Sequence, residues 1–295
     1  MNGQPDTTGY SDNACGSGRA TTRAAPTILR RWSGRNVVYS RGGPCGRPEG
    51  GDRMELSSKT ILEIKALKKA YGLKPILRGI DLTIQQGERI VLLGANGAGK
   101  TTILRILAGL TKPSMGAVSL EGFDILKDAQ QVRRLVGIVA HQPYLYEELT
   151  ALENLLFFGR MYSVNDARER AYGLLQRVGL EKRMRERVGT FSRGQIQRLS
   201  WARALLHSPH LLLLDEPDTG LDQEGHALID ALLMEHTDRG GTTLFTTHQL
   251  ERALELGTRI VLLNGGRIVY QQETASIALE EMREIYQRVC QETSR

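Results

Sequence analysis

A chain of 295 residues of which 40% are hydrophobic is long enough for one large domain or two smaller ones, and its composition is ordinary for a globular protein. The net charge is +6, but residues 1–53 hold eight arginines and four acidic residues, so the remainder carries only about +2 and gives no argument for a nucleic-acid-binding face. The longest apolar runs, such as 211–214, are far shorter than the roughly 18 residues of a membrane-spanning helix. The three cysteines, Cys15, Cys45 and Cys290, lie far apart in the sequence, which favours a reduced cytoplasmic protein without a cysteine metal site.

Residues 1–53 are rich in Gly, Thr, Ser and Arg and hold few apolar side chains, so we expect them to be disordered. Arg30 and Arg31 do not form a twin-arginine export signal, because no apolar core follows them. An arginine-rich organellar transit peptide is the alternative. Since the composition changes at Met54, our hypothesis is that translation starts there and that the folded domain spans residues 54–295.

Residues 60–85 alternate between apolar and polar side chains in the manner of strands. The two segments 61–65 and 80–84 predict a pair of strands, with turns at Gly72 and at 74–75 between them. Tyr71 lies at the head of that turn, 29 residues before Lys100.

A glycine-rich turn then connects a strand to a helix. Residues 89–93 form a β-branched apolar run of strand length, and apolar residues recur at helical spacing through 102–110. Between them, residues 94–101 contain two glycines with four residues between them, then Lys and Thr, which is the pattern of a phosphate-binding loop. The alternative is a merely flexible glycine turn, which the flanking strand and helix disfavour.

In a phosphate-binding loop, unpaired backbone N–H groups and the helix dipole favour a polyphosphate at one spot. Gly94, Gly97 and Gly99 would allow close approach of the backbone. Lys100 would reach the terminal phosphates, and the Thr101 hydroxyl would ligate Mg²⁺.

Two further strands and two helices follow. Strands are predicted at 117–120, after the breaks at Pro113 and Gly116, and at 136–139, with Gln142 just past the end of the second. Thr150 opens a capping box for a helix to about Tyr162. Asn165 is predicted to cap a helix that runs to Val178 and ends at Gly179.

The last third of the chain predicts a helix at 193–206 after Ser192 and a buried parallel strand at 211–214 that delivers Asp215 and Glu216. Asp222 is predicted to cap a helix to about Asp238. A strand at 242–246 precedes His248, a hairpin joins 259–263 to 267–270, and an amphipathic helix covers 275–291.

Four strand ends thus bring Lys100, Gln142, Asp215 with Glu216, and His248 to one edge of a mostly parallel sheet. Phosphoanhydride hydrolysis needs cations for the phosphates, a Mg²⁺ ligand and a group that activates water. Asp215 would hold Mg²⁺ through water, and Glu216 would be the general base. Taken alone, Asp-Glu after a strand is as often a helix-capping turn, and a single histidine is more often structural.

Over residues 60–272 the chain resembles the nucleotide-binding subunit of an ATP-binding cassette (ABC) transporter. Residues 94–101 match the Walker A loop, Gln142 the Q-loop, 191–195 the signature, 211–216 Walker B, 219–222 the D-loop, His248 the switch histidine and Tyr71 the adenine-stacking aromatic. The resemblance implies ATP and Mg²⁺, with catalytic roles for Glu216, His248 and Lys100 and metal contacts from Thr101, Gln142 and Asp215. It assigns ATP binding to Tyr71, Gly94, Ala95, Asn96, Gly97, Ala98, Gly99, Lys100, Thr101, Thr102, Gln142, Ser192, Gly194, Gln195 and Asp222.

The resemblance also implies an α/β fold, with a P-loop NTPase core, a mostly parallel sheet, an N-terminal antiparallel β subdomain and an inserted helical subdomain at about 145–205. It implies a homodimer or pseudo-dimer in which Ser192 and Gly194 of one subunit close over ATP held by Lys100 of the other. A separate transmembrane permease would be the partner, at the cytoplasmic face of the membrane, and no nucleic acid is expected. The signature departs from the family pattern at Phe191 and Arg193, and the sequence does not decide whether Arg193 alters ATP affinity or points to solvent.

A narrower resemblance is to the ATPase of the haem exporter of cytochrome c maturation, carried by residues 141–143, 149–155 and the signature. ATPases of drug, antibiotic or lipid exporters share parts of this pattern. The short segment after His248 leaves no room for a large regulatory domain and favours export. A soluble DNA-repair or translation member of the superfamily is disfavoured, because the chain has neither a long inserted coiled coil nor a second cassette. A binding-only cassette is disfavoured because Glu216 and His248 are both present.

Overall fold

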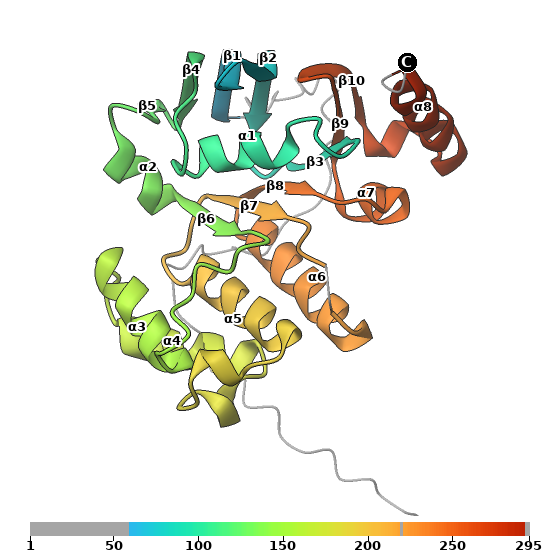
Figure 1. Cartoon of the computed structure of the whole chain (residues 1–295). Coiled ribbons are helices and arrows are strands. Elements are labelled where there is room, and N and C mark those ends of the chain that lie inside the picture. Colours follow the sequence, from blue (N-terminus) through green and yellow to red (C-terminus); the bar gives the residue numbers. More distant parts are fainter. Residues whose placement is uncertain (1–58, 219–220, 293–295) are drawn as a thin grey trace, which may run out of the picture. The chain divides into compact units, whose positions relative to one another are not determined.

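A six-stranded sheet forms the centre of the fold (Figure 1). Its strand order is β10-β9-β3-β8-β7-β6, and every neighbouring pair is parallel except β9 and β10, which form an antiparallel hairpin. The strands are β3 (Arg89–Gly94), β6 (Val136–Val139), β7 (Leu211–Asp215), β8 (Thr242–Thr246), β9 (Arg259–Asn264) and β10 (Arg267–Glu273). The predicted mostly parallel sheet and terminal hairpin are confirmed.

The structure is a computed structural model, and it describes residues 59–218 and 221–292, with the side chains described as far as residue 289. All of these residues belong to one compact unit, Glu55–Arg295. The predictions made for residues 1–53, for the start at Met54, for positions 219 and 220 of the D-loop and for the side chain of Cys290 lie outside the described residues.

A second sheet is antiparallel and has the order β2-β1-β4-β5. Its strands are β1 (Thr60–Tyr71), β2 (Lys74–Gln85), β4 (Met115–Leu120) and β5 (Phe123–Asp124). The first two strands are longer than predicted, because Tyr71 pairs directly with Lys74 across a two-residue turn at Gly72 and Leu73. The predicted turn at 74–75 is therefore wrong, and Pro75 lies inside β2.

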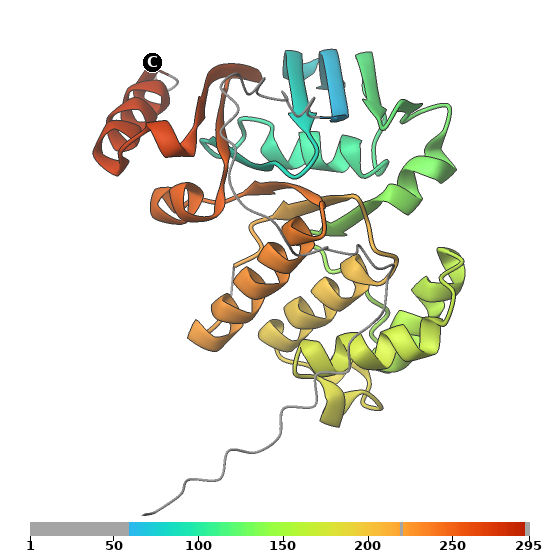
Figure 2. The ribbon, with the colours of Figure 1, turned by 180° about the vertical axis from the view of Figure 1, so that it is seen from behind.

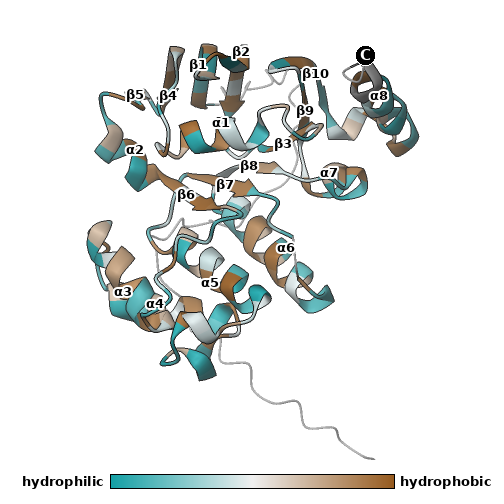
Figure 3. Cartoon of the chain, viewed as in Figure 1, coloured by the Kyte–Doolittle hydropathy of each residue, from teal (hydrophilic) through white to brown (hydrophobic). Residues whose placement is uncertain are grey.

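Alternate residues of the central strands face two different cores, as the two-residue period of a strand requires. Ile90 and Leu92 of β3 pack with α1 (Lys100–Leu107), α2 (Ala129–Leu135) and the antiparallel sheet. Val91 and Leu93 pack with the remaining helices. The two layers of helices on opposite sides of the sheet are visible in Figures 1 and 2, and β6 and β7 form an apolar band between them in Figure 3.

The helices of the second core are α3 (Ala151–Met161), α4 (Ala167–Arg177), α5 (Arg193–Leu205), α6 (Gln223–Asp238), α7 (Leu250–Leu256) and α8 (Leu279–Glu292), with 3₁₀ turns at Glu181–Arg183, Val188–Thr190 and Thr274–Ser276. The predicted helical subdomain at about 145–205 contains α3, α4 and α5, and its boundaries remain a prediction. No helix in the described part of the chain has the length and apolar character needed to cross a bilayer.

Side-chain caps fix several helix starts. Thr150 begins α3 with a complete capping box that includes Glu153, Ser192 begins α5 in the same way with Gln195, and the Asp222 carboxylate accepts the Gly225 N–H at the start of α6. These three sequence predictions are confirmed.

Other predicted helix boundaries are wrong. The cap of α4 is Asp166, which adopts a left-handed conformation with φ of 54°, and not Asn165. Helix α1 ends at Leu107 because Gly109 turns the chain with a positive φ, so Leu110 is exposed instead of buried. Helix α8 begins at Leu279, after a short 3₁₀ turn. The two-residue strand β5 and the short helices α2 and α7 were not predicted.

Candidate active site

The glycine-rich loop connects the end of β3 directly to the first residue of α1. Gly94, Gly97 and Gly99 adopt positive φ angles of 147°, 81° and 110°, which residues other than glycine rarely adopt. A Cβ atom on Gly94 would lie 2.3 Å from the carbonyl oxygen of Leu263 in the neighbouring strand. The glycines therefore make the tight connection between strand and helix possible.

Lys100 is the first residue of α1, and it is buried. Its Nζ donates hydrogen bonds to the carbonyl oxygens of Gly94, at 2.6 Å, and Ala95, at 3.1 Å. The loop thus curls around the ammonium group, while Asn96 and Gly97 at its tip and Thr101 are exposed. A cation at a helix N-terminus, with backbone N–H groups around it, is a favourable site for a polyphosphate.

The carboxyl ends of the parallel strands lie level with one another. Thr246 of β8 is in register with Leu92 of β3 on one side and with Asp215 of β7 on the other, and Val139 of β6 is in register with Leu214. The loops that carry Lys100, Gln142, Glu216 and His248 therefore leave the sheet at the same edge. Ligands of open α/β sheets bind in this position.

A buried threonine organises the two carboxylates at the end of β7. The hydroxyl of Thr246 donates to Asp215 Oδ1 and accepts the backbone N–H of Glu216, both at 2.9 Å. Glu216 has φ of 52°, a conformation that costs a non-glycine residue about 1–3 kcal/mol. The Thr246 hydroxyl thus holds a strained glutamate beside a buried aspartate.

His248 lies against the side chain of Glu216, with its Nε2 2.5 Å from Glu216 Oε1. The two residues line a small cavity of about 90 Å³ together with Asp218, Thr247 and Gln249. Since one water molecule occupies roughly 30 Å³ in the liquid, the cavity has room for water beside the carboxylate.

Arg252 of α7 ties the segment after Glu216 to α6. Its guanidinium donates to the carboxylates of Asp218, at 2.9 Å, and Asp230, at 2.6 Å. Burial lowers the pKa of Arg252, but the hydrogen bonds that it donates to Asp230 and Asp218 outweigh this effect and raise the pKa above its ordinary value. The ion-pair network therefore stays charged and fixes one wall of the small cavity.

Gln142 follows β6 with an exposed side chain. Arg203 of α5 contacts the strand that precedes Gln142, because its Nη2 donates to the carbonyl oxygen of Ile138 in β6 at 2.5 Å. The Arg203 guanidinium also lies 5.8 Å from the ring centre of Tyr144 and 5.3 Å from that of Phe158, within cation–π range. Burial lowers the pKa of Arg203.

Ser192 and Gln195 occupy the N-terminus of α5, which packs in the core on the other side of the central sheet from α1 and Lys100. Ser192 is exposed and Gln195 is partly buried; the Gln195 side chain accepts the Ser192 N–H at 2.9 Å. Gly194 is partly buried, and Arg193 is exposed like Ser192. Phe191 is buried beneath the guanidinium of Arg183.

Tyr71 ends β1 and is 49% exposed. One face of its ring is covered by Lys69, whose Nζ lies 4.8 Å from the ring centre. The remainder of the ring is exposed. Asp222 is engaged as the cap of α6 and lies 3.5 Å from Arg198.

Comparisons with known proteins agree with this geometry. The family model described as ABC transporter matches residues 77–219. The ABC transporter ATP-binding protein NatA of Bacillus subtilis is 36% identical over 211 residues, which cover 70% of this chain and 86% of that protein. The chain belongs to the ATP-binding subunits of ABC transporters.

Other relatives of this ABC subunit are named for export or resistance. It is 39% identical over 229 residues to the Nod factor export ATP-binding protein I of Cupriavidus pinatubonensis, covering 77% of this chain and 70% of that protein. It is 38% identical over 212 residues to the daunorubicin resistance ATP-binding protein DrrA3 of Streptomyces coeruleorubidus, and the match covers 71% of this chain and 67% of that protein.

Solved structures show the same fold. An ATP-binding subunit of an ABC transporter matches with a TM-score of 0.72 and 29% identity, over 77% of this chain and all of the other. A dimeric ATP-binding cassette in a post-hydrolysis state, bound to ADP and phosphate, matches with a TM-score of 0.68 and 30% identity, over 74% of this chain and all of the other. The ABC subunit binds and hydrolyses ATP.

Sequence reasoning missed the role of Thr246 in this ABC subunit. It placed residue 246 in a strand but gave it no part in the site. No local sequence signal marks this role, because it depends on β7 and β8 being neighbours in register. Arg203 and Arg252 were also missed, because their partners are far away in the sequence and only the fold brings them together.

Proposed function

We propose that the chain is the ATP-hydrolysing subunit of an ABC exporter, in which ATP-driven closure of two subunits moves a substrate through a separate transmembrane permease. The observation that carries the proposal is the edge of the parallel sheet, where the buried Lys100 loop, Asp215 and the Glu216–His248 pair are all positioned by neighbouring strands. Relatives named for Nod factor export and daunorubicin resistance support export as the direction.

Each residue of this edge has a role in phosphoryl transfer, which depends mainly on positioning and electrostatics. Lys100 and the loop N–H groups would bind the phosphates. Glu216 would accept a proton from the attacking water in the small cavity, and His248 would orient Glu216 through their hydrogen bond and contact the terminal phosphate.

The donor set also fits a magnesium ion, because hard oxygen ligands are what Mg²⁺ prefers. The hydroxyl of the exposed Thr101, the Gln142 amide oxygen and the Asp215 carboxylate would hold it, with Asp215 acting through water. When bound, Mg²⁺ neutralises charge on the phosphates as the bond to the leaving group breaks. Asp215 keeps its orientation for this task through the bond from Thr246.

A second copy of the chain would complete the nucleotide site. The exposed Ser192 sits at the N-terminus of a 13-residue helix, where hydroxyl, backbone N–H groups and dipole all favour an anion. Because that helix end and the Lys100 loop belong to opposite layers, the natural partner for Ser192 is ATP held by another subunit. Gly194, Gln195 and Asp222 would lie at the same dimer interface.

The permease would contact the region of Gln142 and the helices of residues 150–178. Apolar side chains are exposed there: Tyr146 is 49%, Phe157 is 40% and Met161 is 57% exposed, and the rings of Tyr146 and Phe157 pack edge to face with centres 4.9 Å apart. Aromatic residues and methionine are enriched at protein interfaces. This surface would place the chain at the cytoplasmic face of the membrane as a peripheral subunit.

Substitution of the candidate base tests the hydrolysis mechanism. Glu216→Gln should keep ATP binding but lower steady-state turnover by about 10² to 10⁴, which is the usual contribution of general acid–base catalysis. It should also trap an ATP-bound dimer, measured by sedimentation velocity. Lys100→Ala is the matched comparison, since it should weaken ATP binding itself. Unchanged hydrolysis in Glu216→Gln would remove this residue from the role of base.

Recovery of the partner from membranes tests the transport assignment. Affinity purification of the native chain from detergent-solubilised membranes should recover a polytopic membrane protein. Recovery of ribosomes or DNA instead would favour a soluble member of the superfamily. Haem export is not part of the proposal, because the relatives reported above are named for other substrates.

A further inference from the structure

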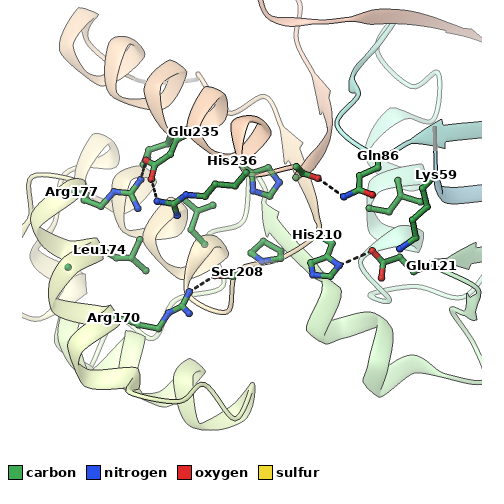
Figure 4. Close-up of a pocket in the computed structure, with 18 residues that line it drawn as sticks. Lys59, Gln86, Glu121, Arg170, Leu174, Arg177, Ser208, His210, Glu235 and His236 are labelled. Atoms are coloured by element: carbon green, nitrogen blue, oxygen red, sulfur yellow. Dashed lines mark hydrogen bonds and ion pairs between the residues drawn. The ribbon is translucent and has the colours of Figure 1, made fainter. Parts of the chain in front are cut away.

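A second cavity, of about 490 Å³, lies at the amino ends of the parallel strands (Figure 4). The loops that carry Lys100 and Glu216 leave the sheet at its opposite edge, at the carboxyl ends of the strands. The segments just before β7 and β8, at 208–210 and 240–241, form part of its wall. Its size is within the range of about 300–1,000 Å³ that is typical of small-molecule sites. The ATP-binding function does not use this cavity.

The cavity combines an apolar floor with a basic rim. Ile61, Leu174 and Leu232 line it and are almost completely buried. The charged lining residues are Lys59, Arg170, Arg177 and Arg239 against Glu121 and Glu235, so four cations face two carboxylates and two positive charges are in excess. Such a lining favours a molecule that is apolar over most of its surface and carries a negative charge at one end.

The ion pairs within the lining do not use all of its positive charge. Glu235 is shared between Arg177 of α4 and Arg239, and Glu121 accepts from His210 Nδ1 at 2.8 Å. Arg170 donates to the Ser208 hydroxyl at 2.5 Å. Among the residues that the structure describes, no carboxylate lies within ion-pair distance of Arg170.

His236 lies deeper in the cavity and is buried. Burial lowers its pKa, against the opposite effect of its hydrogen bond to the Thr242 carbonyl oxygen. Its ring is therefore neutral at neutral pH and adds to the wall without adding charge. Figure 4 shows the labelled arginines of α4 projecting toward α6 and the 208–210 segment, across from His210 and Glu121.

From this arrangement we infer that the cavity binds a small amphiphilic organic anion, with its carboxylate or sulfonate group on Arg170 and its apolar body on Leu174 and Leu232. A guanidinium offers paired N–H donors that match such an oxyanion, and a partly buried site strengthens the attraction. The lining residues come from β1, the β4–β5 turn, α4 and α6, so a bound ligand would bridge the antiparallel sheet and the helical layer.

The test is a fluorescence titration of the full chain with 1-anilinonaphthalene-8-sulfonate, an amphiphilic organic anion. The titration is run with and without saturating Mg·ADP, so that binding at the ATP site is separated from binding here. We expect saturable binding of one probe per chain in both conditions. Decanoate should displace the probe, whereas decanol and inorganic phosphate should not, because the site needs both an oxyanion and an apolar body.

Three variants locate the site. Arg170→Met removes the cation, and Gly173→Leu fills the cavity from a helical position where an added Cβ atom meets nothing within 4 Å. Each should weaken probe binding by about tenfold or more. Arg168→Met is the matched control, since Arg168 is exposed on the same helix and does not line the cavity, and it should bind as the original chain does.

Thermal unfolding followed by circular dichroism gives an independent readout. Decanoate should raise the midpoint of the original chain and of Arg168→Met, but not that of Gly173→Leu, since a ligand stabilises only the state that binds it. The inference would be overturned by non-saturable probe binding, by displacement with decanol equal to that with decanoate, or by unchanged affinity in Gly173→Leu. Gly173→Leu also keeps the inference testable if Arg170→Met fails to fold, because leucine is a better helix former than glycine and Gly173→Leu should therefore fold.

Discussion

The hydroxyl of Thr246 connects the two carboxylate residues of the active site, Asp215 and Glu216. It makes two hydrogen bonds of 2.9 Å, one to the Asp215 carboxylate and one from the Glu216 N–H, and it is fully buried. Thr246→Val removes the hydroxyl but keeps the volume and the β-branched shape of the side chain. Thr246→Ser is the matched control, because it keeps the hydroxyl and loses one methyl group.

The two variants should differ clearly in stability. A hydrogen bond to a charged group contributes about 1.5–3 kcal/mol, and a donor left without a partner adds to the loss, so Thr246→Val should lower the free energy of unfolding by about 2–4 kcal/mol. Thr246→Ser should lower it by roughly 0.5–1.5 kcal/mol, the usual effect of removing one buried methyl group. Urea unfolding without nucleotide, at constant m-value, measures both.

Turnover should follow the same order. Glu216 holds its left-handed backbone conformation through the bond to Thr246, and loss of catalytic positioning reduces rates by up to about 10². We expect Thr246→Val to hydrolyse ATP about 10-fold to 100-fold more slowly and Thr246→Ser to stay within a few-fold of the original chain. Equal stability and equal turnover in the two variants would refute the bridging role.

Two further predictions concern the backbone and the pH dependence of stability. Gly94→Ala should destabilise the chain far more than Gly97→Ala, because a Cβ atom on Gly94 would lie 2.3 Å from a backbone oxygen while one on Gly97 meets nothing within 4 Å; equal urea midpoints would contradict this. Burial lowers the pKa of His207 from 6.5 to about 4, so the unfolded chain binds a proton that the folded chain does not between these pH values, and the free energy of unfolding should fall by up to about 3 kcal/mol as the pH drops from 6.5 to 4. In His207→Gln this part of the pH dependence should vanish, and an unchanged slope would show that other groups cause it.

The elements that carry the site were predictable from the sequence, because each has a strong local signal. The apolar runs at β3 and β7 are completely buried, as unbroken β-branched and leucine segments between helices predict. The capping residues Thr150, Ser192 and Asp222 begin the helices that they were predicted to begin. Local hydrogen bonding determines these starts, so distant parts of the chain have little influence on them.

Features that depend on tertiary contacts were not predictable in this way. Leu110 fits the helical period of α1, yet the helix stops at Leu107, and the signal was the glycine at position 109. The bridge made by Thr246 exists only because β7 and β8 are neighbours in register. The cavity with Arg170 joins segments from residue 59 to residue 241, and no sequence pattern marks it.

The central claim is that each ATP site is shared between two copies of the chain, and mixing two inactive variants tests it most directly. Lys100→Ala and Ser192→Glu should each abolish ATP hydrolysis alone, since every site of either homodimer carries one defect. In an equimolar mixture the mixed dimer has one intact site, so turnover should recover to about a quarter of the original value if the copies exchange at random. If Lys100 and Ser192 of the same copy served one ATP, the mixture would stay inactive at every ratio, and the account would be contradicted.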